Sequence, residues 1–189
     1  MTSFRVVDST ARPNAGYLGI EAVQVEGPDA ARFERIVVRH PGAAVVVALE
    51  TDREHTLLVR QWRVALERDL LEVPAGKLDV DDEPPHDAAR RELEEETGHR
   101  AGRLVKLGEF YNSPGFCDER SYLYCALDLE PLDGRHAVTD EEAEMTVERI
   151  ALSDVDDLIA TGDIVDAKTI IGLLYTRRYL AGEMPGVEV

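Results

Sequence analysis

The stretch GKLDVDDEPPHDAARRELEEETG, residues 76–98, decides the fold of this chain. It begins as a short acid-rich loop and continues into a run of residues that favours a helix. Gly98 suits the end, where a left-handed residue commonly terminates a helix. The spacing therefore predicts a helix over 85–97 that is closed by a glycine.

One face of this predicted helix carries two glutamates beside its apolar stripe. Successive residues lie about 100° apart around a helix, so Ala89 falls about 40° from Leu93, the residue taken to face the core. Glu96 falls about 60° and Glu92 about 100° from the same direction. Two carboxylates directed together at half-buried space repel each other unless a cation joins them. Hard oxygen ligands of this kind indicate Mg²⁺ or Mn²⁺.

A solvated face is the alternative interpretation of any helix rich in glutamate. Arg91 and Glu95 fall nearly opposite Leu93, as an i,i+4 pair of the kind that stabilises exposed helices. A carboxylate that only contacts water is poorly placed at residues 92 and 96, next to the apolar stripe. Their position favours the metal-site hypothesis.

The composition bounds the class of protein. The chain has 189 residues, enough for one sizeable domain with a small appendage. Its net charge of -17 argues against nucleic acid or an anionic membrane as a partner. No apolar run approaches the roughly 18 residues of a membrane span, and the first residues lack the pattern of a signal peptide. The 2 cysteines are too few for a disulfide framework and indicate a reducing cytoplasm.

Alternating and apolar runs predict an α/β fold with a mixed sheet and helices on both sides. Strands are expected at 4–7, 17–25, 33–39, 43–49, 55–61, 70–73, 104–110, 121–129 and 148–152. Helices are expected at 85–97, 153–161 and 167–180, the second with Ser153 as its N-cap, and turns at 12–14 and 27–29. The natural arrangement is an α/β/α sandwich over residues 41–189, preceded by a small β arm over residues 1–40.

The stretch quoted above resembles the Nudix box, the metal-binding loop–helix–loop of a hydrolase superfamily. The usual box has a glycine, five residues, an acid and seven residues, followed by Arg-Glu-aliphatic-any-Glu-Glu-any-Gly-aliphatic. Here six residues separate Gly76 from Glu83, and seven separate Glu83 from Arg91. The extra residue lies in a loop, where insertions cost little, and His99 stands where an aliphatic residue is usual. The part of the box that carries the glutamates is intact.

The resemblance extends over most of the chain. The segments HPGA, LVRQWR, LLEVPAGKLD, NSPGF and DEEAEMTVE follow one another as in the ADP-ribose pyrophosphatase branch of the superfamily. Pro114 lies sixteen residues beyond Gly98, the spacing that marks this branch. The segment GDIVDAKTIIGLLY is similar to the C-terminal helix of these enzymes. The resemblance implies Mg²⁺-dependent hydrolysis of the pyrophosphate bond of ADP-ribose to AMP and ribose 5-phosphate, with Mn²⁺ as a substitute ion.

Two alternatives stay open beside this activity. The first is a pyrophosphatase for another nucleotide sugar, ADP-glucose or GDP-mannose, because the discriminating contacts come from loop and arm side chains. The second is a non-catalytic ADP-ribose sensor on the same scaffold. Such sensors tend to lose box glutamates and to gain a DNA-binding appendage, whereas this chain keeps the glutamates and is strongly acidic.

The resemblance also implies roles for individual box residues. Glu92 and Glu96 match the principal metal ligands, and Glu95 matches a further ligand or support. The backbone carbonyl of Ala75 matches a metal ligand of this branch. Arg91 has two readings, of which fixing the glutamates through ion pairs is favoured over direct contact with phosphate.

The general base is implied to come from the acidic loop 139–144. The match through residues 145–147 favours Glu142, with Glu141 and Glu144 as neighbours that are easily confused with it. A flexible, solvated acidic loop is the alternative interpretation.

Substrate contacts are implied at four further residues. Arg63 matches an arginine near the diphosphate, and its planar fork suits phosphate oxygens. Glu72 matches a position near substrate hydroxyls, but it could equally pair with Arg63 or Lys77. Phe116, which follows Pro114 in the branch-specific loop, matches the border of the adenine or ribose pocket, although a loop aromatic is more often a packing residue.

The resemblance finally implies an assembly and a partner. In this branch the N-terminal β arm exchanges between the subunits of a homodimer and helps to build the neighbour's substrate pocket. Residues 1–40 are therefore expected to be a dimerisation arm, and the partner is expected to be a small nucleoside diphosphate sugar.

Overall fold

The computed structural model describes residues 5–135 and 143–189, apart from the side chains of residues 12–15. The chain divides into two compact units. The first unit comprises residues 1–42 and 110–120, and the second comprises residues 43–109 and 121–189. The first unit thus holds the expected N-terminal arm together with a later loop that the sequence did not indicate as part of it.

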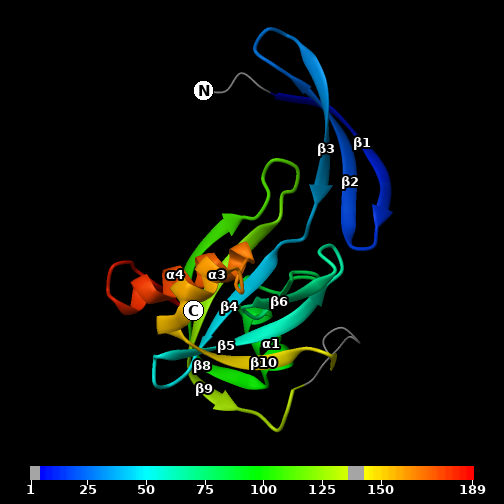
Figure 1. The fold of residues 1–189 in the computed structure, drawn as a ribbon. Coiled ribbons are helices and arrows are strands. Elements are labelled where there is room, and N and C mark those ends of the chain that lie inside the picture. Colours follow the sequence, from blue (N-terminus) through cyan, green and yellow to red (C-terminus); the bar gives the residue numbers. More distant parts are fainter. Residues whose placement is uncertain (1–4, 136–142) are drawn as a thin grey trace. The chain divides into compact units, whose positions relative to one another are not determined.

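An antiparallel sheet forms the first unit. In it β1 (Arg5–Ala15) pairs with β2 (Leu18–Glu26), and β2 pairs with β3 (Arg32–Arg39), strands that Figure 1 draws in shades of blue. The loop 110–120 runs beside β3. The Val38 amide donates to the Phe116 carbonyl at 2.7 Å, and the Asp118 amide donates to the Val38 carbonyl at 3.2 Å. These backbone bonds attach the loop to the sheet.

One expected turn in this unit was wrong. The chain does not turn at residues 12–14, because β1 continues to Ala15 and reverses at Gly16, whose φ is 64°. Pro13 is tolerated there because β1 is an edge strand, and the pairing shifts register between Arg12 and Ala15. The turn expected at 27–29 is confirmed, since the Gly27 amide donates to the Ala31 carbonyl at 2.8 Å.

A mixed sheet forms the centre of the second unit. Its strands are β4 (Ala43–Leu49), β5 (His55–Arg63), β6 (Arg68–Glu72), β7 (Ala75–Lys77), β8 (His99–Tyr111), β9 (Arg120–Pro131), β10 (Thr146–Ala151) and β11 (Val187–Glu188). The order is β10-β5-β4-β9-β8-β11, with β6 paired to β5 and β7 paired to β4. β4 runs parallel to β9 and antiparallel to β5.

Helices cover both faces of this sheet. They are α1 (Pro85–Thr97), α3 (Val155–Thr161) and α4 (Ala167–Leu180), with a 3-10 turn, η1 (Leu152–Asp154), before α3. Val46 and Ala48 of β4 share a buried cluster with Leu93 of α1. Val47, between them, lies against Gly172 of α4. Successive side chains of a strand point to opposite faces, so α1 and α4 lie on opposite sides, and the expected α/β/α sandwich is confirmed (Figure 1).

The ends of several elements differ from the prediction. Ser153 is not the N-cap of α3: it lies in η1, its hydroxyl donates to Asp154 Oδ1 at 2.9 Å, and α3 has no side-chain cap. β7 and β11 were not expected, because strands of 3 and 2 residues are too short to show a period. The helices predicted over 85–97 and 167–180 are confirmed. Among the helices of the described ranges, none is long and apolar enough to cross a membrane.

Candidate active site

The short strand β7 brings the backbone against helix α1. β7 pairs with β4, and just before it the Pro74 carbonyl accepts a hydrogen bond from the Val46 amide at 2.9 Å. At residue 76 an added β-carbon would lie 1.8 Å from the carboxyl carbon of Glu92. A side chain at residue 76 would therefore displace the Glu92 carboxylate, and glycine lets the backbone run directly along it.

Helix α1 turns two glutamates into the protein, as the sequence predicted. Its buried residues are Ala88, Ala89, Glu92, Leu93, Glu96 and Thr97. Glu92 is 8% exposed and Glu96 is 5% exposed. The helix closes at Gly98, whose φ of 69° is left-handed and whose amide donates to the Glu94 carbonyl at 3.0 Å. The carboxylates therefore lie on the inner side of the helix.

The backbone of β7 also holds the second of these glutamates. The Ala75 amide donates to Glu96 Oε2 at 3.0 Å. Ala75, whose carbonyl was predicted as a metal ligand, thus lies beside one predicted carboxylate ligand, and Gly76 lies beside Glu92, the other. The structure brings these predicted residues together although about twenty residues of loop and helix separate them.

Arg91 is shared by three carboxylates. Its Nε and Nη2 donate to Glu83 at 3.1 Å each, and its Nη1 donates to Glu92 at 2.7 Å and to Glu95 at 3.0 Å. The hydrogen bonds to Glu83, followed by the charge of Glu92, raise the pKa of Arg91 above its ordinary value. The sequence favoured a role for Arg91 in fixing the glutamates through ion pairs, and these contacts are ion pairs of that kind. They hold the glutamates in a defined orientation.

The chemistry of these side chains fits a hard divalent cation. Glu83, Glu92 and Glu95 all contact the Arg91 guanidinium. Carboxylates gathered around one cation repel each other, and a divalent ion would relieve that repulsion. Carboxylate and carbonyl oxygens are the ligands that Mg²⁺ and Mn²⁺ prefer. Because residue 76 has no side chain, its backbone lies close to the Glu92 carboxylate.

Arg63 and Glu72 form a two-pronged ion pair between β5 and β6. Arg63 Nε and Nη2 each donate to a Glu72 oxygen at 2.7 Å. Glu72 is 1% exposed. The hydrogen bond to Glu72 is the largest cause that raises the pKa of Arg63 above its ordinary value. The sequence allowed either Arg63 or Lys77 as the partner of Glu72, and in the structure the partner is Arg63. Lys77 Nζ lies 3.6 Å from Asp79.

Three other predicted site residues lie outside the second unit or outside the described residues. Pro114 and Phe116 belong to the first unit, where Phe116 is 58% exposed. Glu142, the expected general base, lies outside the described residues, as does Glu141. Glu144 is described and exposed.

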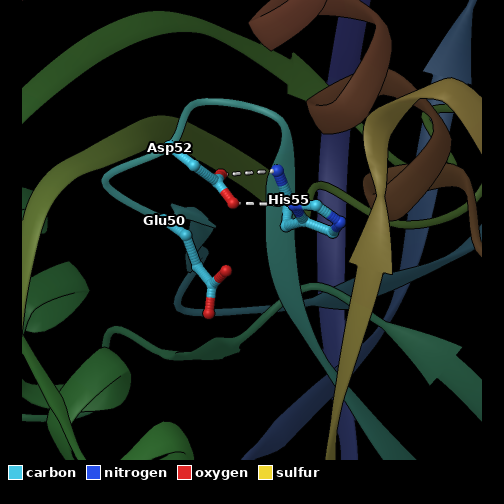
Figure 2. A group of neighbouring side chains, drawn as sticks. All are labelled: Glu50, Asp52 and His55. Atoms are coloured by element: carbon cyan, nitrogen blue, oxygen red, sulfur yellow. Dashed lines mark hydrogen bonds and ion pairs between the residues drawn. The ribbon is translucent and has the colours of Figure 1, made fainter.

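A second acidic group lies at the turn between β4 and β5. Within residues 5–135 and 143–189 it is the one group of three His, Cys, Asp or Glu residues whose ligand atoms lie within 4.8 Å of one another: Glu50, Asp52 and His55. Figure 2 shows Asp52 hydrogen-bonded to His55, whose amide lies 3.1 Å and whose Nδ1 lies 2.8 Å from the carboxylate. An open hollow of about 420 Å³ adjoins this turn.

This second group already holds a cation of the protein itself. Arg149 donates to Glu50 Oε2 at 2.6 Å and to Asp52 Oδ2 at 2.8 Å. The guanidinium joins β10 to the turn and pairs with both carboxylates. We therefore interpret the group as a structural ion-pair cluster, distinct from the box glutamates.

Sequence reasoning missed a set of polar residues at the start of α4. Asp166, the N-cap of this helix, accepts a hydrogen bond from the Thr169 amide at 2.9 Å. Lys168 Nζ lies 2.6 Å from Asp166 Oδ1 and 3.5 Å from Glu72 Oε2. The aspartate before a predicted helix was a visible capping signal, but nothing local in the sequence connects it with Glu72.

Comparisons with known proteins identify the class that this fold and these glutamates define. Residues 38–171 match the family model described as NUDIX domain. The chain therefore belongs to the NUDIX family. The match spans strands β4 to β10, the box and the first turn of α4.

Several relatives are similar to this chain over most of its length. The chain is 40% identical to an ADP-ribose pyrophosphatase of Bacillus subtilis over 80% of both chains. It is 36% identical to a methanol dehydrogenase activator of Bacillus methanolicus over 82% of this chain and 83% of the relative. It is 34% identical to an ADP-ribose pyrophosphatase of Mycobacterium tuberculosis over 95% of this chain and 86% of the relative. A crystal structure of an ADP compounds hydrolase has the same fold, with a TM-score of 0.82, 23% identity and 97% of each chain covered.

Proposed function

We propose that the chain is a Mg²⁺-dependent hydrolase that cleaves the pyrophosphate bond of ADP-ribose, giving AMP and ribose 5-phosphate. The observation that carries the proposal is the contact of Ala75 and Gly76 with the buried carboxylates Glu96 and Glu92, in a chain of the NUDIX family. The likeness to two proteins named ADP-ribose pyrophosphatase supports the choice of substrate.

The box residues would hold the metal. The Ala75 carbonyl, Glu92 and Glu96 would be the ligands, with Glu95 as a further ligand. Mn²⁺ would serve as a substitute for Mg²⁺. A bound divalent ion supplies positive charge that offsets the negative charge of the diphosphate oxygens, so that water can approach phosphorus. Arg91 positions the glutamates through its ion pairs.

The remaining roles fall on residues outside the box. Arg63 would bind diphosphate oxygens through its planar fork, and Glu72 would hold that fork in place. Glu142 would take the proton from the attacking water. Replacing Glu142 by glutamine should lower kcat by about 10²–10⁴-fold with little change in substrate binding. Near-normal turnover in Glu142→Gln, or an equal loss in Glu144→Gln, would move the role to another acid of the loop.

The arm of the first unit would help to build the neighbouring subunit's substrate pocket in a homodimer. Pro114 and Phe116 would border the adenine or ribose, and the sheet of residues 1–40 would form a homodimer interface. Large apolar side chains are exposed on this unit, among them Val6 at 64%, Tyr17 at 55% and Ile36 at 49%. Exposed apolar patches commonly mark association surfaces. We place the enzyme in the cytoplasm, which suits its free cysteines Cys117 and Cys125.

Product analysis tests the proposal. The protein is incubated with ADP-ribose and Mg²⁺, with ADP-glucose and GDP-mannose in parallel, and the products are separated by chromatography. We expect AMP and ribose 5-phosphate to form fastest from ADP-ribose and the reaction to stop with EDTA. Faster cleavage of a hexose nucleotide would retain the reaction and change the substrate. No metal-dependent cleavage of any of the three would overturn the proposed activity.

A further inference from the structure

A buried hydrogen-bond chain connects the start of helix α4 with the segment that enters β7. The Thr169 hydroxyl donates to Asp166 Oδ2 at 2.8 Å and accepts from the Val73 amide at 2.9 Å. Thr169 is 0% exposed and Val73 is 1% exposed. A buried hydroxyl that both donates and accepts fixes the distance between the two groups it joins, because breaking either bond would leave a buried polar group without a partner.

A partly buried chain of charged side chains runs beside it. Lys168 Nζ lies 2.6 Å from Asp166 Oδ1 and 3.5 Å from Glu72 Oε2, and the lysine side chain is 17% exposed. Glu72, which also accepts both prongs of Arg63, therefore lies between two cations. Two carboxylates and two cations balance one another in this cluster, so Arg63 is not the sole countercharge of Glu72.

The segment 72–76 is consequently held from two sides. On the α4 side, the Glu72 carboxylate contacts Lys168 and the Val73 amide contacts Thr169. On the α1 side, the Ala75 amide contacts Glu96, and Gly76 runs along Glu92. A displacement of the Val73 backbone at the α4 end would therefore also move the backbone of Ala75 and Gly76, which lies beside the box glutamates.

We propose that Thr169 and Lys168 are positioning residues of the active site, acting from α4 through the segment 72–76. Thr169 sets the backbone that carries the Ala75 carbonyl against the box glutamates. Lys168 supplies a second positive charge beside Glu72 while Glu72 holds the Arg63 fork in place for an anionic substrate. The inference rests on the proposed function, because it assigns these residues to the same metal site and the same arginine.

The Thr169 arm of the test uses a matched pair of threonines on α4. Thr169 and Thr176 are both 0% exposed, but the Thr176 hydroxyl lies beside the Cys125 thiol and outside the chain to Val73. Mn²⁺ binding is measured by calorimetry without substrate, and exchange of the Val73 amide is measured by NMR. In Thr169→Val we expect Mn²⁺ affinity to fall about 10-fold or more, as for outer partners of metal ligands, and the Val73 amide to exchange faster.

The control and the rescue define the outcome of this arm. Thr176→Val should keep wild-type Mn²⁺ affinity even if its melting temperature falls, and Thr169→Ser should restore both readouts because it keeps the hydroxyl. Wild-type Mn²⁺ affinity in Thr169→Val, or an equal loss in Thr176→Val, would overturn the inference. If the wild-type protein binds Mn²⁺ but cleaves no nucleotide sugar, the proposed function fails while the binding data still decide the role of Thr169.

The Lys168 arm separates KM from kcat. Methionine at residue 168 keeps the length of the side chain and removes its charge, so Glu72 retains Arg63 as its partner. We expect KM for ADP-ribose to rise about 10-fold in Lys168→Met while kcat stays within about 3-fold, the pattern of lost ground-state binding. Lys168→Arg, which keeps the charge, should stay nearer the wild type. An unchanged KM in Lys168→Met would overturn the role of Lys168.

Discussion

Gly76 lies so close to Glu92 that the carboxylate occupies the space of a side chain at residue 76. A β-carbon there would lie 1.8 Å from Cδ and 1.9 Å from Oε1 of Glu92. Contacts of that length are impossible, so any other residue would displace either the β7 backbone or the carboxylate. The pair explains in physical terms why the quoted stretch begins with glycine.

Gly76→Ala should therefore damage the site more than the fold. We expect kcat/KM to fall about 100-fold, since displacement of a catalytic group by an ångström has effects of that size. Gly108→Ala is the matched control, because its β-carbon would meet the Tyr175 ring at 3.4 Å, an ordinary contact. Steady-state kinetics and thermal melting check both variants. Equal activity of the two would show that Glu92 does not need its present position.

Arg91→Gln should destabilise the protein by about 1–2 kcal/mol, because three carboxylates lose their shared partner. Urea unfolding at low salt measures the change. Arg100 offers the comparison: it pairs with Glu94 of the same helix, but its side chain is 58% exposed. Exposed pairs contribute little, so Arg100→Gln should leave the midpoint nearly unchanged. A loss as large as that of Arg91→Gln would contradict the special role of Arg91.

Asp166→Asn should cost stability in a pH-dependent way. Burial alone would raise the pKa of Asp166, but the charge of Lys168 and hydrogen bonds from Lys168 and Thr169 hold the pKa below its ordinary 3.8. The ionised form thus stabilises the fold above pH 3.8, and this stabilisation is lost as the pH falls through the lower, folded-state value. Asparagine caps a helix as well as aspartate does, so the variant removes mainly the charge.

Urea unfolding of the wild type and Asp166→Asn at several pH values measures this difference. We expect the gap between the two free energies of unfolding to be widest near neutral pH and to narrow below pH 3.8. A difference in free energy of unfolding that does not change with pH would mean that the ion pair between Asp166 and Lys168 does not stabilise the fold.

Deletion of residues 1–38 tests the assembly. If the first sheet is a dimerisation arm, the truncated protein should be monomeric and impaired in ADP-ribose hydrolysis. Light scattering and kinetics check the two properties. A truncated monomer with full activity would contradict the role given to the arm.

Local signals explain which elements could be predicted. Pro85 and Gly98 bracket α1, and the apolar period within it placed Glu92 and Glu96 on the inner face. Local signals failed where the structure overrode them: the edge strand β1 passes through Pro13 despite the turn-like sequence.

The part of the site that escaped prediction depends on contacts between distant residues. The hydrogen bond from Val73 to Thr169 spans 96 residues. Neither residue is unusual in its own segment, since a valine near a strand and a threonine in a helix are ordinary. The contact forms because α4 packs over the sheet, which places the Thr169 hydroxyl where it accepts a hydrogen bond from the Val73 amide before β7.

The most direct test of the central claim compares two neighbouring glutamates of α1 in ADP-ribose hydrolysis at saturating Mg²⁺. Glu96 is buried and contacts the Ala75 amide, whereas Glu94 pairs with Arg100 on the outside. We predict that Glu96→Gln lowers kcat by more than about 100-fold, beyond the usual effect of outer-shell partners, while Glu94→Gln retains near-normal turnover. Equal activity of the two variants would contradict the assignment of the box glutamates to a catalytic metal.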